Sequence, residues 1–278
     1  MESATTQSPG ILRRYFDFFG RQWLSIGWTL RNVGSFALIT IGVCITKFRV
    51  SRHVVSPLVR QQIAHAGIGL LPWVLFLGLS LGLVVIGQTV SLLTKVGSTE
   101  FIGTVMDAVI FRELGPLTAA LLVLARMGTT TVVELGTKRA RGEIEALEAL
   151  GIDPVHYLVV PRVIGLALSI FALTIYLVIT VMLSGLLFAV VTDVPITPAE
   201  YFGQIANGLT YRDFVFLGIK TVMFGAIIAV VTCFHGLAQP IELEQVPRAA
   251  SRALTQSTAA CLVFNAFFIV LYILLGTE

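Results

Sequence analysis

The chain has 278 residues, of which 56% are hydrophobic and 13% charged, and its formal net charge is +3. Soluble domains carry about 25% charged residues, so this composition excludes an ordinary soluble domain and indicates an integral membrane protein. The three cysteines, Cys44, Cys233 and Cys261, lie within or at the end of apolar runs and have neither metal-ligand nor disulfide spacing. We therefore interpret them as small buried hydrophobic residues.

Residues 1–60 are predicted to form a cytoplasmic and interfacial amphipathic region. Aromatic residues alternate with arginines between Ile11 and Lys47, a pattern typical of a helix that lies in the headgroup layer. The apolar run Val33–Thr46 has 14 residues, fewer than the roughly 18 that a span needs. A re-entrant or interfacial element is therefore favoured, and a tilted span that begins near Trp23 is the open alternative.

Residues 61–278 are predicted to form one all-α membrane domain with five transmembrane helices. The long apolar runs place the spans at about 66–93, 101–125, 163–191, 214–234 and 253–275. Gly78, Gly82 and Gly87 in the first span permit the close approach of a neighbouring helix. Spans three and four are joined by a polar connection, in which a short helix is expected to start near Pro198.

Lysine and arginine are distributed unequally between the two sides of these spans. Eight precede the first span, four lie between spans two and three, and two lie between spans four and five. The opposite side has only Lys95 and Arg212. Because cytoplasmic loops are enriched in these residues, we predict that the N-terminus and the 134–162 loop are cytoplasmic and that the C-terminus lies outside.

Two charged residues, Arg112 and Glu113, are neighbours inside the second span. Charges at membrane depth cost several kcal/mol unless they are paired or line a wet cavity. Neighbours on an α-helix point about 100° apart, so each needs a partner on another element, and Lys220 in the fourth span is the candidate for Glu113. Two interpretations stay open: a structural ion pair that locks helices together, or a polar feature of a substrate cavity or gate.

The pair Gly115-Pro116 follows these charges directly. Proline removes one helical hydrogen bond and bends a helix, so we expect a bend that is either architectural or a hinge. Arg126 lies near the cytoplasmic end of the same span. It is expected either to reach toward lipid headgroups or to pair with a carboxylate such as Glu134.

The segment 143–154, EIEALEALGIDP, combines an apolar stripe with flanking carboxylates. Ile144, Leu147 and Leu150 recur at helical spacing, and Gly151 supplies a helix stop. An anionic leaflet would repel this acidic helix, so docking into a groove of a soluble protein is favoured over a helix that lies on the headgroups. The predicted contact residues are Glu143, Ile144, Leu147, Glu148, Leu150, Gly151, Asp153 and Pro154.

Metal-ligand spacing and a phosphate-loop motif are not found in the sequence. The four histidines lie far apart, and no G-x-x-x-x-G-K-[ST] phosphate loop occurs. We therefore expect a non-enzymatic chain with no catalytic residue, no metal site and no cofactor of its own. Any energy source must belong to another subunit.

Five short motifs follow one another between Arg112 and Arg162: R-E-L-G-P, A-R-x-G, E-x-G, E-x-x-x-L-E-x-x-G-x-D-P and V-x-P-R. This series resembles the MlaE/YrbE family, the permease subunits of ABC transporters that work with MCE-domain proteins. The similarity extends from about Pro57 to Gly276. It implies a homodimer with an N-terminal interfacial helix, five spans, and a coupling helix at Glu143–Leu150 that contacts a cytoplasmic ATPase.

The resemblance also implies a function. The chain would be the permease subunit of an ATP-driven transporter that moves phospholipid, or a related lipid, between the bacterial inner membrane and a periplasmic MCE-protein assembly. ATP and Mg would bind the separate ATPase, and no nucleic acid is expected as a partner. The residues expected at the lipid pocket, or as polar residues within the membrane, are Arg112, Glu113, Gly115, Pro116, Arg126 and Lys220.

The chain departs from the family pattern near its last span. Relatives commonly carry a glycine-rich stretch before this span and an aspartate within it, whereas here the corresponding segments contain Pro247 and Asn265. Contacts assigned to that aspartate therefore cannot be transferred unchanged.

Two other classes of protein stay as alternatives. A carrier driven by an ion gradient would favour inverted repeats, into which five spans divide poorly. A membrane scaffold without transport activity would leave three charged residues at membrane depth without a purpose.

Overall fold

A computed structural model describes residues 31–44, 52–97, 102–191, 197–237 and 242–276 of the chain. Every regular element within these ranges is helical. Five helical stretches are long and apolar enough to cross a membrane: Ser56–Val96, Ile102–Ala140, Val155–Val191, Tyr211–Leu237 and Leu243–Leu274. The prediction of an all-α protein with five spans is confirmed.

The spans are built from consecutive helical segments. The first contains α2 (Arg52–Ala66), η1 (Ile68–Leu70), α3 (Leu71–Leu81), η2 (Gly82–Ile86) and α4 (Gly87–Val96). The second contains α5 (Ile102–Met106), η4 (Asp107–Leu114), α6 (Gly115–Val123), η5 (Leu124–Gly128) and α7 (Thr129–Ala140). The short α8 (Glu143–Ala149) leads to the third, made of η6 (Val155–Val159) and α9 (Val160–Val191). After α10 (Pro198–Gly208), the last two spans are α11 (Tyr211–Leu237), and η7 (Leu243–Gln245) with α12 (Val246–Gly276).

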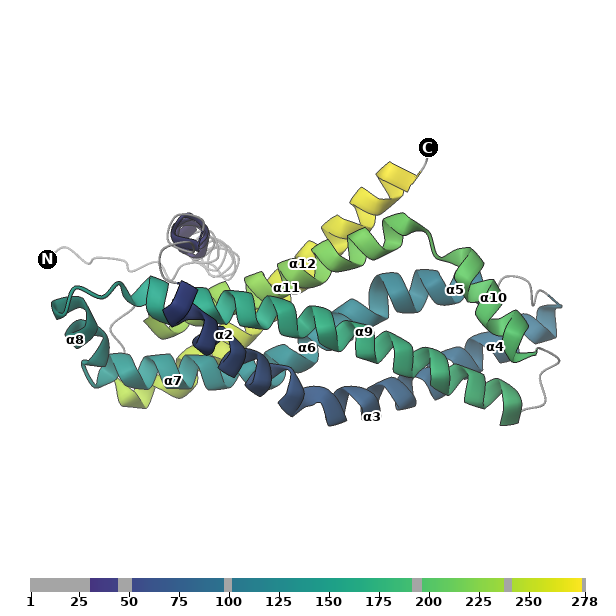
Figure 1. Cartoon of the computed structure of the whole chain (residues 1–278), viewed down its shortest axis with the longest axis horizontal. Helices are drawn as coiled ribbons and strands as arrows, with labels where there is room; N and C mark the ends of the chain where they lie inside the picture. The colour runs from purple at the N-terminus through teal and green to yellow at the C-terminus, as the bar shows by residue number, and fades with distance from the viewer. Residues whose placement is uncertain (1–30, 45–51, 98–101, 192–196, 238–241, 277–278) are drawn as a thin grey trace, which may run out of the picture.

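The spans run side by side along the long axis of the molecule, with α8 at one end and α10 at the other (Figure 1). The core lies where α9 meets α11, because Leu166, Ile170 and Leu173 pack in one cluster with Phe224 and Ile228. At its C-terminal end α12 diverges from the bundle, and much of its apolar surface is exposed (Figure 1).

The described helices extend further than the apolar runs. The second span was expected to end near 125, with a polar loop from 134, but the helix continues to Ala140. Its last part, α7, buries Val132 and Leu135, and α7 packs against α11 and α12. Tertiary packing therefore maintains the helix beyond the apolar stretch, where composition alone predicts a loop.

A shorter apolar helix, Arg31–Cys44, precedes the spans. It is seen end-on in Figure 1 while the spans run across the view, so it lies crosswise to them. Phe36 packs edge-to-face on Phe234 of α11, with the ring centroids 5.8 Å apart. This orientation agrees with the predicted interfacial helix; the rest of that prediction, residues 1–30 and 45–51, lies outside the described residues.

Glycines of the first span allow its close contact with α9. A Cβ atom on Gly82 would overlap Ser184, and one on Gly87 would lie 2.8 Å from the ring of Phe188. The residues 78–82 also spell G-x-S-x-G, but they lie inside α3 and η2. A nucleophilic serine of that motif stands on a strand-to-helix turn, so these residues serve helix packing here.

The connection between spans three and four contains the expected short helix, α10. Thr197 and Glu200 form a capping box, in which the Thr197 N–H donates to Oε2 of Glu200 at 2.9 Å. This hydrogen bond lowers the pKa of the Glu200 carboxyl. Tyr201 of α10 is buried and donates to the carbonyl of Met182 at 3.1 Å, which ties α10 to the end of α9.

Candidate functional site

The charged residues of the second span lie in a π-helical segment, η4. A π-helix bonds residue i to residue i+5, and short π-helical segments are frequent at functional sites. Gly115 accordingly donates its N–H to the carbonyl of Ile110. The same spacing brings Arg112 onto Asp107, five residues earlier, with a distance of 2.6 Å between Nη2 and Oδ2. A partner for Arg112 thus comes from its own helix.

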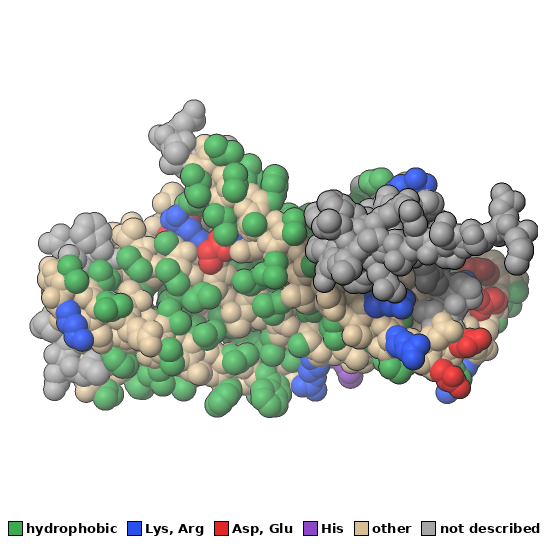
Figure 2. Space-filling model, turned by 180° about the vertical axis from the view of Figure 1, so that it is seen from behind, with side chains coloured by type: hydrophobic (Ala, Val, Ile, Leu, Met, Phe, Trp, Pro, Cys, Tyr) green, Lys and Arg blue, Asp and Glu red, His purple; other side chains and the backbone are tan. Residues whose placement is uncertain are grey.

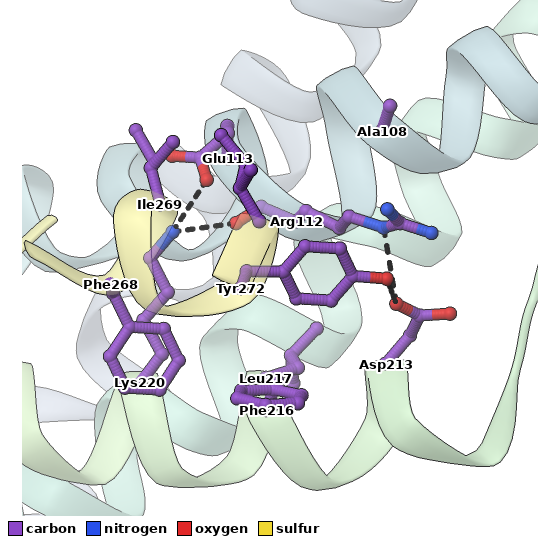
Figure 3. Close-up of a pocket in the computed structure, with 11 residues that line it drawn as sticks. Ala108, Arg112, Glu113, Asp213, Phe216, Leu217, Lys220, Phe268, Ile269 and Tyr272 are labelled. Atoms are coloured by element: carbon purple, nitrogen blue, oxygen red, sulfur yellow. Dashed lines mark hydrogen bonds and ion pairs between the residues drawn. The ribbon is translucent and has the colours of Figure 1, made fainter. Parts of the chain in front are cut away.

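A second carboxylate and an aromatic ring complete the surroundings of Arg112. Asp213, at the start of α11, forms an ion pair with Nε of Arg112 at 3.1 Å. The hydroxyl of Tyr272, on α12, donates to Asp213 at 3.0 Å, and the Arg112 guanidinium lies 4.4 Å from the centre of the Tyr272 ring (Figure 3). Three membrane helices therefore converge on one guanidinium.

Pro116 affects the site through the backbone. It lacks an N–H, so it cannot donate to the carbonyl of Arg112, four residues earlier. That carbonyl accepts a hydrogen bond from Nζ of Lys220 at 2.7 Å (Figure 3). The structure thus places a backbone acceptor for a lysine of another span one turn before Pro116, the residue at which a bend was anticipated.

Glu113 forms the predicted pair with Lys220 and has a second partner. Oε1 of Glu113 lies 3.0 Å from Nζ of Lys220, whose side chain is only 3% exposed. Oε2 accepts a hydrogen bond of 2.9 Å from the amide of Asn265 on α12. Asn265 was noted above as a departure from the family pattern. Its amide donates to the Glu113 carboxylate, whereas an aspartate at this position would repel that carboxylate.

A cavity of about 200 Å³ lies beside α12, and its polar lining residues are Arg112, Glu113, Asp213, Lys220 and Tyr272. Its other walls are apolar and include Phe216, Leu217, Phe268 and Ile269 (Figure 3). Figure 2 shows basic and acidic side chains close together here within an otherwise hydrophobic surface. Arg112 and Glu113 are 28% and 33% exposed. The cavity therefore offers both charged and apolar contacts, which is the chemistry that an amphipathic molecule needs.

Arg126 does not form the alternative lock on Glu134. The two carboxylate oxygens of Glu134 contact Lys138 at 2.9 Å and Arg162 at 2.7 Å. The Arg126 side chain is exposed and has no ion pair among the described residues. Arg126 is not among the residues that line the cavity beside α12.

The predicted coupling segment forms α8, and its stripe divides between two faces. Ile144 is 1% exposed and Leu147 is half-buried, and both pack on a cluster that contains Leu135 and Cys233. Leu150 is 75% exposed. The stripe as a whole was expected to face a partner, but Ile144 and Leu147 hold α8 against its own chain. The exposed face has Glu143, Glu145, Ala146, Glu148, Ala149 and Leu150.

Some residues of the site were not recognised in the sequence. Asp107 lies in the same apolar run as Arg112, and this position could have marked it as a partner. The distance of five residues does not match α-helical spacing, so α-helical periodicity gave no such signal. Asp213 was assigned to a polar connection and Tyr272 to an apolar span, although both contact the cluster.

Five helices that are long and apolar enough to cross a membrane, with charged residues paired between spans two and four, are typical of a multi-pass membrane protein with a functional polar site. Comparison with known families identifies it further: residues 59–271 match the family model described as Permease MlaE. The chain belongs to the MlaE family of ABC transporter permeases.

Three relatives illustrate the range of this family. A probable ABC transporter permease protein of Rickettsia felis is 28% identical over 235 residues, which cover 84% of this chain and 90% of the relative. The intermembrane phospholipid transport system permease protein MlaE of Haemophilus influenzae is 25% identical, with 88% and 93% covered. The chloroplastic protein TRIGALACTOSYLDIACYLGLYCEROL 1 of Arabidopsis thaliana is 28% identical, with 75% and 60% covered.

Proposed function

We propose that this chain is the permease subunit of an ATP-driven transporter that moves phospholipid between a bacterial inner membrane and a periplasmic MCE-protein assembly. Its N-terminus and α8 are cytoplasmic and its C-terminus is periplasmic, in agreement with the distribution of lysine and arginine. Phospholipid transport is also the role for which the Haemophilus relative is named, as an intermembrane phospholipid transport system permease protein.

The observation that carries the proposal is the cavity beside α12. A phospholipid has a charged headgroup and apolar chains, and the cavity has a partly exposed guanidinium, that of Arg112, next to the rings of Phe216 and Phe268. The Arg112 nitrogen Nη1, which pairs with neither Asp107 nor Asp213, would contact the headgroup, and the apolar walls would contact the start of the chains. The buried Lys220 would hold Arg112 and Glu113 in position through its two contacts with them.

A homodimer would complete this site. The cavity of about 200 Å³ is smaller than the roughly 300–1,000 Å³ of most ligand pockets, so one chain offers only part of a lipid site. Beside it, α12 exposes Val263, Phe267, Val270 and Leu274. A second copy that covered this apolar face would enlarge and enclose the cavity.

ATP hydrolysis would take place on a separate subunit, which would bind ATP and Mg. The chain has no phosphate-loop motif. The exposed carboxylates of α8, Glu143, Glu145 and Glu148, together with Leu150, form a small surface at one end of the bundle that is suited to the groove of such an ATPase (Figure 1). Gly151, Asp153 and Pro154 would fix the return of the chain from this surface to α9.

Native mass spectrometry of the complex purified on this chain tests the proposal. We expect two copies of the chain, two copies of an ATPase and bound phospholipid. A chain that is purified with its genomic neighbours and carries neither ATPase nor lipid would contradict it, and would favour a carrier driven by an ion gradient or a scaffold.

A further inference from the structure

A second cavity, of about 390 Å³, lies between α2, α7 and the start of α9. It shares no lining residue with the cavity beside α12. The helices that line it meet toward the end of the bundle that carries α8 (Figure 1). Most of its lining residues are polar, and the permease site described above makes no use of them.

The charges of this second cavity do not balance. Glu134 accepts from Lys138 with one oxygen and pairs with Arg162 through the other, so its carboxylate is fully used. Arg162 is 8% exposed, and among the described residues its other terminal nitrogen contacts just the carbonyl of Leu158, at 3.4 Å. Two cations and one carboxylate leave a net charge of +1 on the lining of this partly open cavity.

Unused hydrogen-bond donors face the same space. Gln61, Gln62 and His65 come from α2, and Tyr157 comes from η6. In the part of the chain that the structure describes, none of these four side chains has a hydrogen bond. A cavity that combines several such donors with a positive charge is suited to an anionic ligand, because anionic oxygens accept hydrogen bonds from neutral and charged donors alike.

We propose that this cavity binds a phosphate group, that of a phospholipid headgroup in the leaflet on the α8 side. Lys138 and Arg162 would supply the charge, and the side chains from α2 would donate further hydrogen bonds to the phosphate oxygens. The first span continues from the cavity with exposed apolar residues, Ile68, Trp73 and Phe76, along which acyl chains can lie. Figure 2 shows a histidine and a basic side chain where the hydrophobic surface gives way to the charged end.

This inference rests on the proposed function in one respect: the α8 side is cytoplasmic only if that proposal is correct. The binding of a phosphate group itself does not require transport. Lys138 is the residue to change. It is partly exposed, and exposed ion pairs contribute little to stability, so Lys138→Gln is expected to fold. Arg141→Gln is the matched control, because Arg141 is exposed, lies three residues further along the chain, and does not line the cavity.

The experiment places a photoreactive benzoylphenylalanine at Tyr157, which is 37% exposed, in the full chain reconstituted into nanodiscs. The discs contain a phosphate-free glycolipid with increasing fractions of phosphatidylglycerol. Mass spectrometry after illumination measures the covalent adduct with phosphatidylglycerol. We expect Lys138→Gln to raise the half-saturating fraction about tenfold, the usual effect of losing one hydrogen bond to a charged group. Arg141→Gln should leave it unchanged.

Inorganic phosphate separates the two sources of the ligand. If millimolar phosphate suppresses the adduct, the cavity recognises the phosphate group alone; if it does not, the cavity requires the lipid, and both results support the proposal. Equal adduct yields with the glycolipid and with phosphatidylglycerol, or equal effects of the two variants, would overturn it. Copurification of the ATPase is measured on the same preparations, so failure of this inference is distinguishable from failure of the transporter proposal.

Discussion

Lys220 of α11 donates a hydrogen bond of 2.7 Å to the backbone carbonyl of Arg112, the carbonyl to which Pro116 cannot donate. The same ammonium contacts the Glu113 carboxylate at 3.0 Å. A proline inside a membrane span is tolerated where other groups satisfy the freed backbone. Here the substitute donor is a charged side chain from another span, so the backbone of the second span and the position of α11 depend on each other.

Pro116→Ala tests this dependence. Alanine restores an N–H that competes with Lys220 for the Arg112 carbonyl, and it removes a residue unfavourable in helices by about 3 kcal/mol. We expect an unchanged or higher melting temperature, and lipid transport reduced about tenfold, as for the loss of one charged hydrogen bond. Proteoliposome transport and thermal unfolding are the measurements.

Pro57→Ala is the control, because Pro57 lies within α2, away from the cluster. Transport at the original rate in Pro116→Ala would show that the freed carbonyl has no function.

Lys220→Met should destabilise the fold strongly. It leaves Glu113 without a counter-charge, and breaking a buried ion pair by removing one partner costs about 3–5 kcal/mol. The double variant Lys220→Met with Glu113→Gln should recover much of this loss, because it leaves no unpaired charge. Unfolding is measured in the same detergent for the wild type, Lys220→Met, Glu113→Gln and the double variant. The four values give the coupling energy between the two residues. Additive effects of the two substitutions would mean that the 3.0 Å contact contributes nothing specific.

Asn265→Asp should also destabilise, by about 1–3 kcal/mol, because it replaces a donor to Glu113 with an acceptor. Exchanging the two groups provides a sharp test. In the variant Glu113→Gln with Asn265→Asp, the amide and the carboxylate change places and one donor faces one acceptor again. We expect the exchanged protein to melt closer to the wild type than Asn265→Asp alone. No recovery would indicate that Asn265 acts through its shape and not through its hydrogen bond.

Much of the fold follows from composition and charge, because a membrane allows few structures. Five long apolar runs must be helices, since lipid offers no partner to the backbone. The pairing of Glu113 with Lys220 followed from the same logic, because charges at membrane depth need partners. These inferences use general constraints of the bilayer and need no knowledge of helix packing.

The rest depends on local geometry and on tertiary contacts. The contact between Arg112 and Asp107 requires a π-helical segment, which hydrophobic periodicity does not reveal. The stripe of α8 is visible in the sequence, but only packing shows that Ile144 faces its own chain and Leu150 faces outward. In the same way, the continuation of the second span to Ala140 reflects contacts of α7 with α11 and α12.

The capping box of α10 predicts a pH-dependent contribution to stability. Because the pKa of Glu200 is lowered in the folded protein, its contribution is present above the ordinary glutamate pKa, about 4.3, and is lost as the pH falls through the lowered value. Glu200→Gln should therefore lower the melting temperature at pH 7 and have little effect once the pH lies below that lowered pKa. Glu244→Gln, at an exposed glutamate of η7, is the control. A difference between Glu200→Gln and wild type that persisted at acid pH would exclude the carboxylate as its source.

The exposed face of α8 is tested by Glu148→Arg combined with Leu150→Asp. Both residues are exposed, so neither change affects the packing of Ile144 and Leu147 on the cluster around Leu135. Reversing one charge and removing one apolar contact should reduce the amount of copurified ATPase at least about tenfold, because unpaired interface groups cost about 1–3 kcal/mol each. The melting temperature of the isolated chain should not change.

Ile144→Asp gives the contrasting result for the same helix. It introduces a charge into a position that is 1% exposed, so it should lower the melting temperature of the isolated chain as well as the ATPase yield. The two variants thus separate loss of docking from loss of folding. Normal ATPase yield and lipid transport in the Glu148→Arg, Leu150→Asp protein would show that this face of α8 is not the contact, and would direct attention to the other exposed residues at the same end of the bundle.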